Sequence, residues 1–100
     1  MLPAGSKVQT NRVIDEVWEE RIKQIQKWGN ASDDAQVNGE IAQGAAAYTL
    51  NCPQIFPHDE VIWNRDGFKT EAVVGRRGQL IRAAAMIVAE IERLDRLSHD

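Results

Sequence analysis

The C-terminal third of the chain carries a periodic apolar pattern that limits the possible folds more than any other feature. Apolar residues recur there at alternating spacings of four and three, which place them on one face of a helix. We therefore expect one long amphipathic helix from about residue 76 to residue 97, with an apolar seam like that of a coiled coil. The seam comprises Leu80, Ala84, Ile87, Ile91 and Leu94.

Further apolar residues widen this face to about half of the helix circumference. They are Ile81, Ala83, Met86, Val88 and Leu97, while arginines gather on the opposite side. A face of this width must be covered on two sides to leave water. Two shorter helices of the same chain or a second copy of the chain would supply that cover.

Two shorter helices are predicted upstream, over residues 12–28 and 40–50. Gly29 is a plausible stop for the first, and Asn38 is a plausible cap for the second, which is rich in alanine and glycine. Residues 1–10 are expected to form a loose arm, and residues 30–38 a polar connection.

The stretch 53–75 is predicted to be a long irregular connection. Pro53 and Pro57 break it, and residues 64–67 have the composition of a turn. Residues 61–63 and Phe68 either pair as a short hairpin or pack on the helices. The predicted fold is thus all-α, with a single domain over residues 1–100 that contains three helices and is expected to form homo-oligomers.

Composition excludes several functional classes. The net charge of −3 over 100 residues argues against general binding to nucleic acid. One cysteine, Cys52, and two histidines make a zinc site improbable and are typical of a protein of the reducing cytoplasm. The chain shows neither a membrane-spanning apolar run nor the apolar core of a signal peptide.

Arg21 is the clearest departure from the apolar pattern, because it falls on the stripe of Ile14, Trp18, Ile25 and Trp28. A buried guanidinium needs a carboxylate or a phosphate as its partner. Glu40, Glu90 and Asp95 are the acids expected to face it. Two interpretations remain open, namely an internal ion-pair network that fixes helix register and a polar pocket that binds a ligand.

Other polar residues suggest a phosphorylated ligand. Arg76 and Arg77 precede the long helix, where free backbone N–H groups and guanidinium groups together suit a phosphate. Asp33 and Asp34, with Glu40, either act as caps or bind magnesium. Gln24, Trp28 and Trp63 are further candidates for ligand contact, Trp63 by stacking on a base, although packing is the more common role of a tryptophan.

Two segments resemble a group of small, mostly uncharacterised proteins of tailed bacteriophages and prophages. The first holds Glu20-Arg21, Lys27-Trp28-Gly29, Asp33-Asp34 and Gly39-Glu40-Ile41-Ala42, and the second runs from Arg76 to Arg96. The resemblance implies a phage protein that acts in the cytoplasm of an infected bacterium.

A second resemblance is to the all-helical nucleoside-triphosphate pyrophosphatases of the MazG type. Those enzymes bind magnesium and a triphosphate through Glu-x-x-Glu on one helix and Glu-x-x-Asp on the next. Glu16–Glu19 and Glu92–Asp95 match these spacings. On helical wheels, however, Glu16 and Glu19 lie off the apolar stripe and Glu92 points away from the seam, so the acid set is scattered.

Three functions are therefore compatible with the sequence. The first is a binder of a nucleotide-like ligand without a cofactor, which in a phage suggests sequestration of a host immune signalling nucleotide. The second is a magnesium-dependent pyrophosphohydrolase of the MazG type. The third is an interaction module that binds a protein through the face of the long helix.

Overall fold

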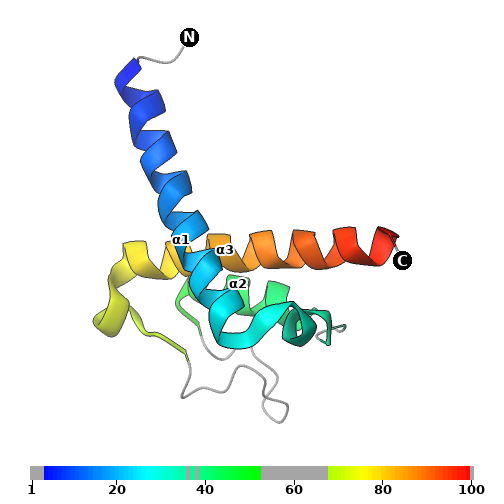
Figure 1. Cartoon of the computed structure of the whole chain (residues 1–100). Helices are drawn as coiled ribbons and strands as arrows, with labels where there is room; N and C mark the ends of the chain where they lie inside the picture. The colour runs from blue at the N-terminus through cyan, green and yellow to red at the C-terminus, as the bar shows by residue number, and fades with distance from the viewer. Residues whose placement is uncertain (1–3, 36, 38, 53–67, 100) are drawn as a thin grey trace.

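The computed structural model describes residues 4–35, 37, 39–52 and 68–99, and these residues form three helices (Figure 1). Helix α1 spans Ala4–Asp34, α2 spans Glu40–Leu50 and α3 spans Glu71–His99. No strand occurs within these described ranges. The predicted all-α class with a long C-terminal helix is confirmed, whereas most of the hairpin considered at residues 61–68 lies outside the described part of the chain.

Helix α3 is the centre of the molecule, because α1 and α2 each pack against it. Helix α1 crosses α3 steeply, and its N-terminal half extends away from the other two helices (Figure 1). The buried core joins the small residues of α2 to α3 and to Phe68. Its members are Ile41, Ala45, Ala47, Tyr48, Phe68, Ala83, Met86 and Ala89.

Two glycines interrupt the long helices. Gly29 in α1 has φ 79° and ψ 167°, and Gly75 in α3 has φ 76° and ψ 161°. Only glycine adopts this region of backbone space readily. The predicted stop at Gly29 is therefore a kink, after which the chain resumes a helical turn through Asp34. The prediction of a polar connection was wrong for residues 30–34, because ion pairs that depend on the tertiary structure hold this turn.

The starts of α1 and α3 differ from the predicted boundaries. Helix α1 begins at Ala4, so most of the predicted arm 1–10 is helical, since no proline interrupts residues 4–10 and the helix extends back from its packed part. Residues 71–75, predicted to be irregular, form the first turn of α3. The straight part of α3 begins after Gly75, where the sequence placed it.

Helix α2 has the predicted bounds, but its caps differ from the prediction. Its N-cap residue is Gly39 in the left-handed conformation, without a side-chain cap bond, and Asn38 lies outside the described residues. At the C-terminus Asn51 is also left-handed, and its N–H donates to the carbonyls of Ala47 and Tyr48. The N–H of Cys52 donates to the Ala47 carbonyl at 2.8 Å, which closes the helix end.

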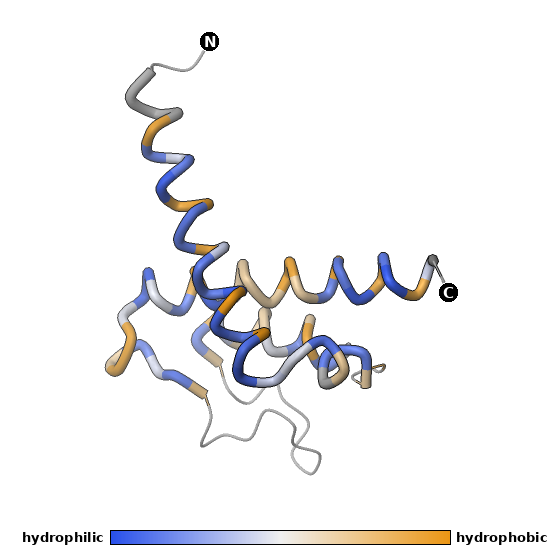
Figure 2. The backbone as a smooth tube through the Cα atoms, viewed as in Figure 1, coloured by the Kyte–Doolittle hydropathy of each residue, from blue (hydrophilic) through white to orange (hydrophobic). Residues whose placement is uncertain are grey.

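The buried face of α3 is not the predicted seam. The seam residues Leu80, Ile87, Ile91 and Leu94 are 43–53% exposed, whereas Ala83, Ala85, Met86 and Ala89 are at most 3% exposed. The two faces differ by one residue in register, which corresponds to about 100° of rotation. The small residues face the protein interior because they let α2 approach closely. Apolar residues therefore remain at the surface along α3 and along the extending half of α1 (Figure 2).

Candidate functional site

Arg21 forms the centre of a buried ion-pair network. Its side chain is 2% exposed, and its Nη2 donates to Asp33 Oδ2 at 3.0 Å while its Nε donates to Glu92 Oε1 at 2.6 Å. The expectation that Arg21 needs carboxylate partners is confirmed. The acids named for that role, Glu40, Glu90 and Asp95, are not its partners, because Arg21 meets α3 on the side that holds Glu92, while Glu90 pairs with Arg93.

The network continues along α3 to the start of α2. Arg96 bonds Asp34 Oδ1 through Nε at 2.9 Å and through Nη2 at 2.7 Å, and Arg93 bonds Glu90. The Glu90 hydrogen bond, with smaller contributions from the charges of Asp34 and Glu40, raises the pKa of the Arg93 guanidinium against the opposing effect of desolvation. These contacts match the interpretation in which paired charges fix helix register.

The carboxylates proposed for magnesium are engaged with arginines. Asp33 is held by Arg21 and Asp34 by Arg96, while Glu40 lies near Arg93. Within the described ranges, no group of three or more acidic, histidine or cysteine side chains is arranged to hold a metal ion. The structure therefore does not assemble Asp33, Asp34 and Glu40 as one set of ligands.

Arg76 and Arg77 turn toward different partners. Arg76 donates from Nη1 to the Tyr48 carbonyl at 3.1 Å and from Nη2 to the Thr49 carbonyl, so it caps the C-terminus of α2. Arg77 pairs with Glu16 on α1, and this hydrogen bond lowers the pKa of the Glu16 carboxyl and raises that of the Arg77 guanidinium. The two guanidinium groups do not converge on a common phosphate position.

The acids that resemble the MazG set lie far apart. Glu16 is held at Arg77 and Glu92 is held at Arg21. Residues 77 and 92 are fifteen positions apart on α3, which is about 22 Å along a helix. A polar pocket of about 210 Å³ does lie between α1 and α3, where Glu16, Glu19 and Glu20 face Lys23, Arg77 and Arg82.

The aromatic candidates are dispersed. Trp28 is 44% exposed, with Lys27 Nζ 4.6 Å from its ring centroid, and Gln24 is half-buried. Trp18 is 63% exposed, so it is not part of the core of this chain. Trp63 lies outside the described residues. Neither Trp18 nor Trp28 lines the polar pocket that contains Arg77.

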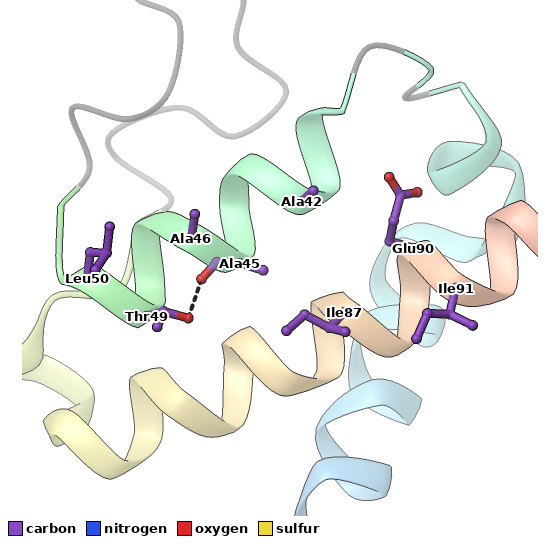
Figure 3. Close-up of a pocket in the computed structure, with 8 residues that line it drawn as sticks. All are labelled: Ala42, Ala45, Ala46, Thr49, Leu50, Ile87, Glu90 and Ile91. Atoms are coloured by element: carbon purple, nitrogen blue, oxygen red, sulfur yellow. Dashed lines mark hydrogen bonds between the residues drawn. The ribbon is translucent and has the colours of Figure 1, made fainter.

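An apolar groove lies between α2 and α3 (Figure 3), and the sequence analysis did not predict it. Its volume is about 460 Å³. Ile87 and Ile91 of α3 form one wall, with Glu90 at the end near Ala42 and Leu50 at the opposite end. The hydroxyl of Thr49 donates to the Ala45 carbonyl at 2.7 Å, so it presents no unsatisfied donor to the groove. The sequence signal for this site was the combination of a small-residue helix and an unused apolar seam. The lining residues are Ala42, Ala45, Ala46, Thr49, Leu50, Ile87, Glu90 and Ile91.

Comparison with known proteins gives no relative from which a function can be transferred. No protein-family model matches the chain, and neither the curated proteins nor the solved structures contain a significant match. In the described part of the chain, no helix has the length and apolar character needed to cross a membrane.

Proposed function

We propose that this protein is a helical interaction module that binds an amphipathic helix of a protein partner in the groove between α2 and α3. The observation that carries the proposal is the exposed seam itself. Ile87 and Ile91 are 50% and 53% exposed in the folded chain, beside an open apolar groove. Contiguous apolar surface of this kind marks interaction sites in soluble proteins.

The lining of the groove favours a helix as the occupant. The floor on α2 is made of alanines, which let another backbone approach closely, and the isoleucines of α3 stand beside it (Figure 3). Helices that bind grooves present apolar residues at intervals of three and four, which match such a surface. Glu90 is the charged residue in the lining, and it is already paired with Arg93, so the contact with the occupant is mainly apolar.

The test is a pull-down with the purified chain, comparing the wild type with Ile87→Asp. Val73→Asp is the matched control, because Val73 is 73% exposed but lies outside the groove. We expect a partner that the wild type and the control retain and that Ile87→Asp loses, with direct binding reproduced from purified components. Equal recovery by all three proteins, or no recovery by any from a chain that also does not pair with itself, would contradict the proposal.

A second candidate, binding of a nucleotide-like ligand, is supported by the polar pocket between α1 and α3. Lys23, Arg77 and Arg82 line it and provide cations for a phosphate. Three glutamates line it as well, so a ligand would have to displace Glu16 from Arg77 or bring a cation with it. Sequestration of an immune signal in a phage rests on the sequence resemblance.

A capture-and-release assay tests this second candidate and its enzymatic alternative together. The protein is incubated with nucleoside triphosphates and cyclic nucleotides, with and without magnesium, then filtered and denatured, and the released compounds are identified by mass spectrometry. Intact ligand supports binding, whereas converted ligand supports hydrolysis. If nothing is captured or converted, both alternatives fail.

A further inference from the structure

Among the described residues, no other helix covers the N-terminal half of α1. Every described side chain from Val8 to Asp15 is exposed, and the ribbon of this half extends clear of α2 and α3 (Figure 1). Isolated helices shorter than about 12–15 residues are marginal in water. This half continues the packed half of α1, and since most helical stability in proteins comes from packing of an apolar face, it gains stability from packing against another surface.

The exposed half of α1 carries an apolar stripe that continues a buried one. Ile14 and Trp18 lie on the same stripe as Arg21, whose side chain is buried against α3. Ile14 is 60% exposed and Trp18 is 63% exposed. The stripe that packs on α3 thus continues into the half of α1 that extends away from α3, where hydrophobic positions recur along the tube in Figure 2.

We infer that the occupant of the α2–α3 groove is the N-terminal half of α1 from a second copy of this chain, in a reciprocal two-fold dimer. The inference rests on the proposed function, since it assigns the partner of the same groove. One protein supplies both the uncovered stripe and the uncovered groove. A two-fold axis lets each protomer donate its α1 and receive that of the partner, which closes the assembly at two chains.

The area available fits a stable dimer. On each protomer the stripe and the groove expose five large apolar side chains, each at least 50% exposed, which provide roughly 400 Å² of apolar surface. Interfaces are about 56–65% apolar, so the pair would bury on the order of 1,300 Å² in total, which is within the range of specific complexes. The five are Ile14, Trp18, Leu50, Ile87 and Ile91.

The first measurement is the mass of the full chain in solution by light scattering over a hundredfold dilution series. We expect two chains of 11.2 kDa each at high concentration. Ile14→Asp and Ile87→Asp should each raise the dissociation constant roughly tenfold or more, because a charge then enters the contact. Val73→Asp should leave it unchanged. A wild-type chain that is monomeric throughout would overturn the inference.

Disulfide crosslinking identifies which surfaces meet. In a Cys52→Ser background, full chains carrying Ile14→Cys or Trp18→Cys are mixed with chains carrying Ile87→Cys or Ile91→Cys and oxidised. Disulfides require Cα atoms within about 7 Å. We expect crosslinks mainly between the two kinds of chain. Crosslinking mainly within the Ile87→Cys sample would show pairing of one α3 with another, and would overturn the assignment.

The two proposals fail in different ways. A monomeric chain that still binds another protein through Ile87 contradicts the second-copy inference and leaves the interaction module standing. A chain that neither dimerises nor captures a partner contradicts both.

Discussion

At the residue scale, Arg21 joins the kinked end of α1 to α3. Its guanidinium is almost fully buried, and Asp33 beside it is 8% exposed. A buried ion pair adds little net stability compared with a well-packed apolar residue, but loss of one partner leaves the other charge without compensation. Arg21 therefore fixes the position of the turn 30–34 more than it adds to the free energy of unfolding.

Replacement of Arg21 tests this role. We expect Arg21→Met to lower the free energy of unfolding by about 3–5 kcal/mol, because Asp33 stays buried without its partner. Glu92→Gln is the milder comparison, since Glu92 is 43% exposed at its side chain, and we expect a loss of about 1 kcal/mol. Urea titration at one fixed protein concentration measures both. Equal losses for the two variants would contradict the buried-charge argument.

The titration of the Tyr48 phenol reports the burial of this side chain in the core. Its ring stacks on Phe68 with centroids 4.6 Å apart, and the Lys69 backbone N–H donates to its hydroxyl oxygen at 3.1 Å. Burial raises the pKa of the Tyr48 phenol above the ordinary value of 10.0, and the hydrogen bond from Lys69 only partly offsets this. The folded state thus favours the protonated phenol.

The sign of the resulting pH dependence follows from this shift. Because the pKa is higher in the folded state, the stabilisation is fully present below the unfolded pKa of about 10. It is lost as the pH rises through the folded pKa. The chain has one tyrosine, so tyrosinate absorbance reports this group alone. We expect a higher titration midpoint in the folded protein than in urea, and equal midpoints would contradict the burial.

At the element scale, the two kinks depend on glycine. Gly29 and Gly75 have φ values of 79° and 76°, with an extended ψ that side-chain-bearing residues rarely adopt. No neighbouring atom lies within 4 Å of a Cβ at either position, so backbone strain rather than collision sets the cost of a substitution.

Substitution of Gly29 isolates the backbone effect. We expect Gly29→Ala to lower the free energy of unfolding by about 1–3 kcal/mol. Asn30→Ala is the control in the adjacent exposed position, and its effect should stay within about 0.5 kcal/mol. Thermal unfolding followed by circular dichroism compares the two. A loss for Asn30→Ala as large as that for Gly29→Ala would show that the kink is not the cause.

The C-terminus of α2 is held by side chains of α3. Arg76 donates to the carbonyls of Tyr48 and Thr49, and Gln79, which is fully buried, donates to Asn51 Oδ1 at 2.7 Å. The Arg76 bonds cap the carbonyls of the last turn of α2, and the Gln79 bond holds the side chain of the C-cap residue Asn51. The same contacts set the separation of α2 and α3, and therefore the shape of the groove.

Removal of the Arg76 guanidinium should loosen this junction. We expect Arg76→Met to cost about 1.5–3 kcal/mol, because its bonds to carbonyls are charge-assisted. Arg77→Met is the matched comparison, since its pairing with Glu16 is exposed and should contribute less than the Arg76 bonds. Chemical denaturation measures the free energy of unfolding of both variants. An equal loss would show that the Arg76 bonds do not stabilise the end of α2 more than an exposed ion pair does.

At the scale of the whole molecule, secondary structure and assembly should be coupled. If the first half of α1 is covered only by a second copy, then dilution below the dissociation constant should reduce helicity at 222 nm. Ile14→Asp should show the reduced helicity at all concentrations. Helicity that stays constant while the mass falls to one chain would mean that this half of α1 is stable without a partner.

The all-α class, the bounds of α2, the break at Gly29 and the long C-terminal helix followed from the sequence alone. Each is determined locally, by the periodicity of apolar residues or by the conformational freedom of glycine. The need of Arg21 for carboxylate partners followed in the same way, because the cost of burying a charge does not depend on the fold.

The identity of those partners and the location of the groove were decided by the tertiary structure. Two apolar faces of α3 differ by one residue in register, and both satisfy the helical pattern. Only the close approach of α2 selects Ala83, Met86 and Ala89 for the core and leaves Ile87 and Ile91 outside. Helix α1, which carries Arg21, contacts the side of α3 that holds Glu92, whereas Glu90 lies on the side toward α2 and pairs with Arg93.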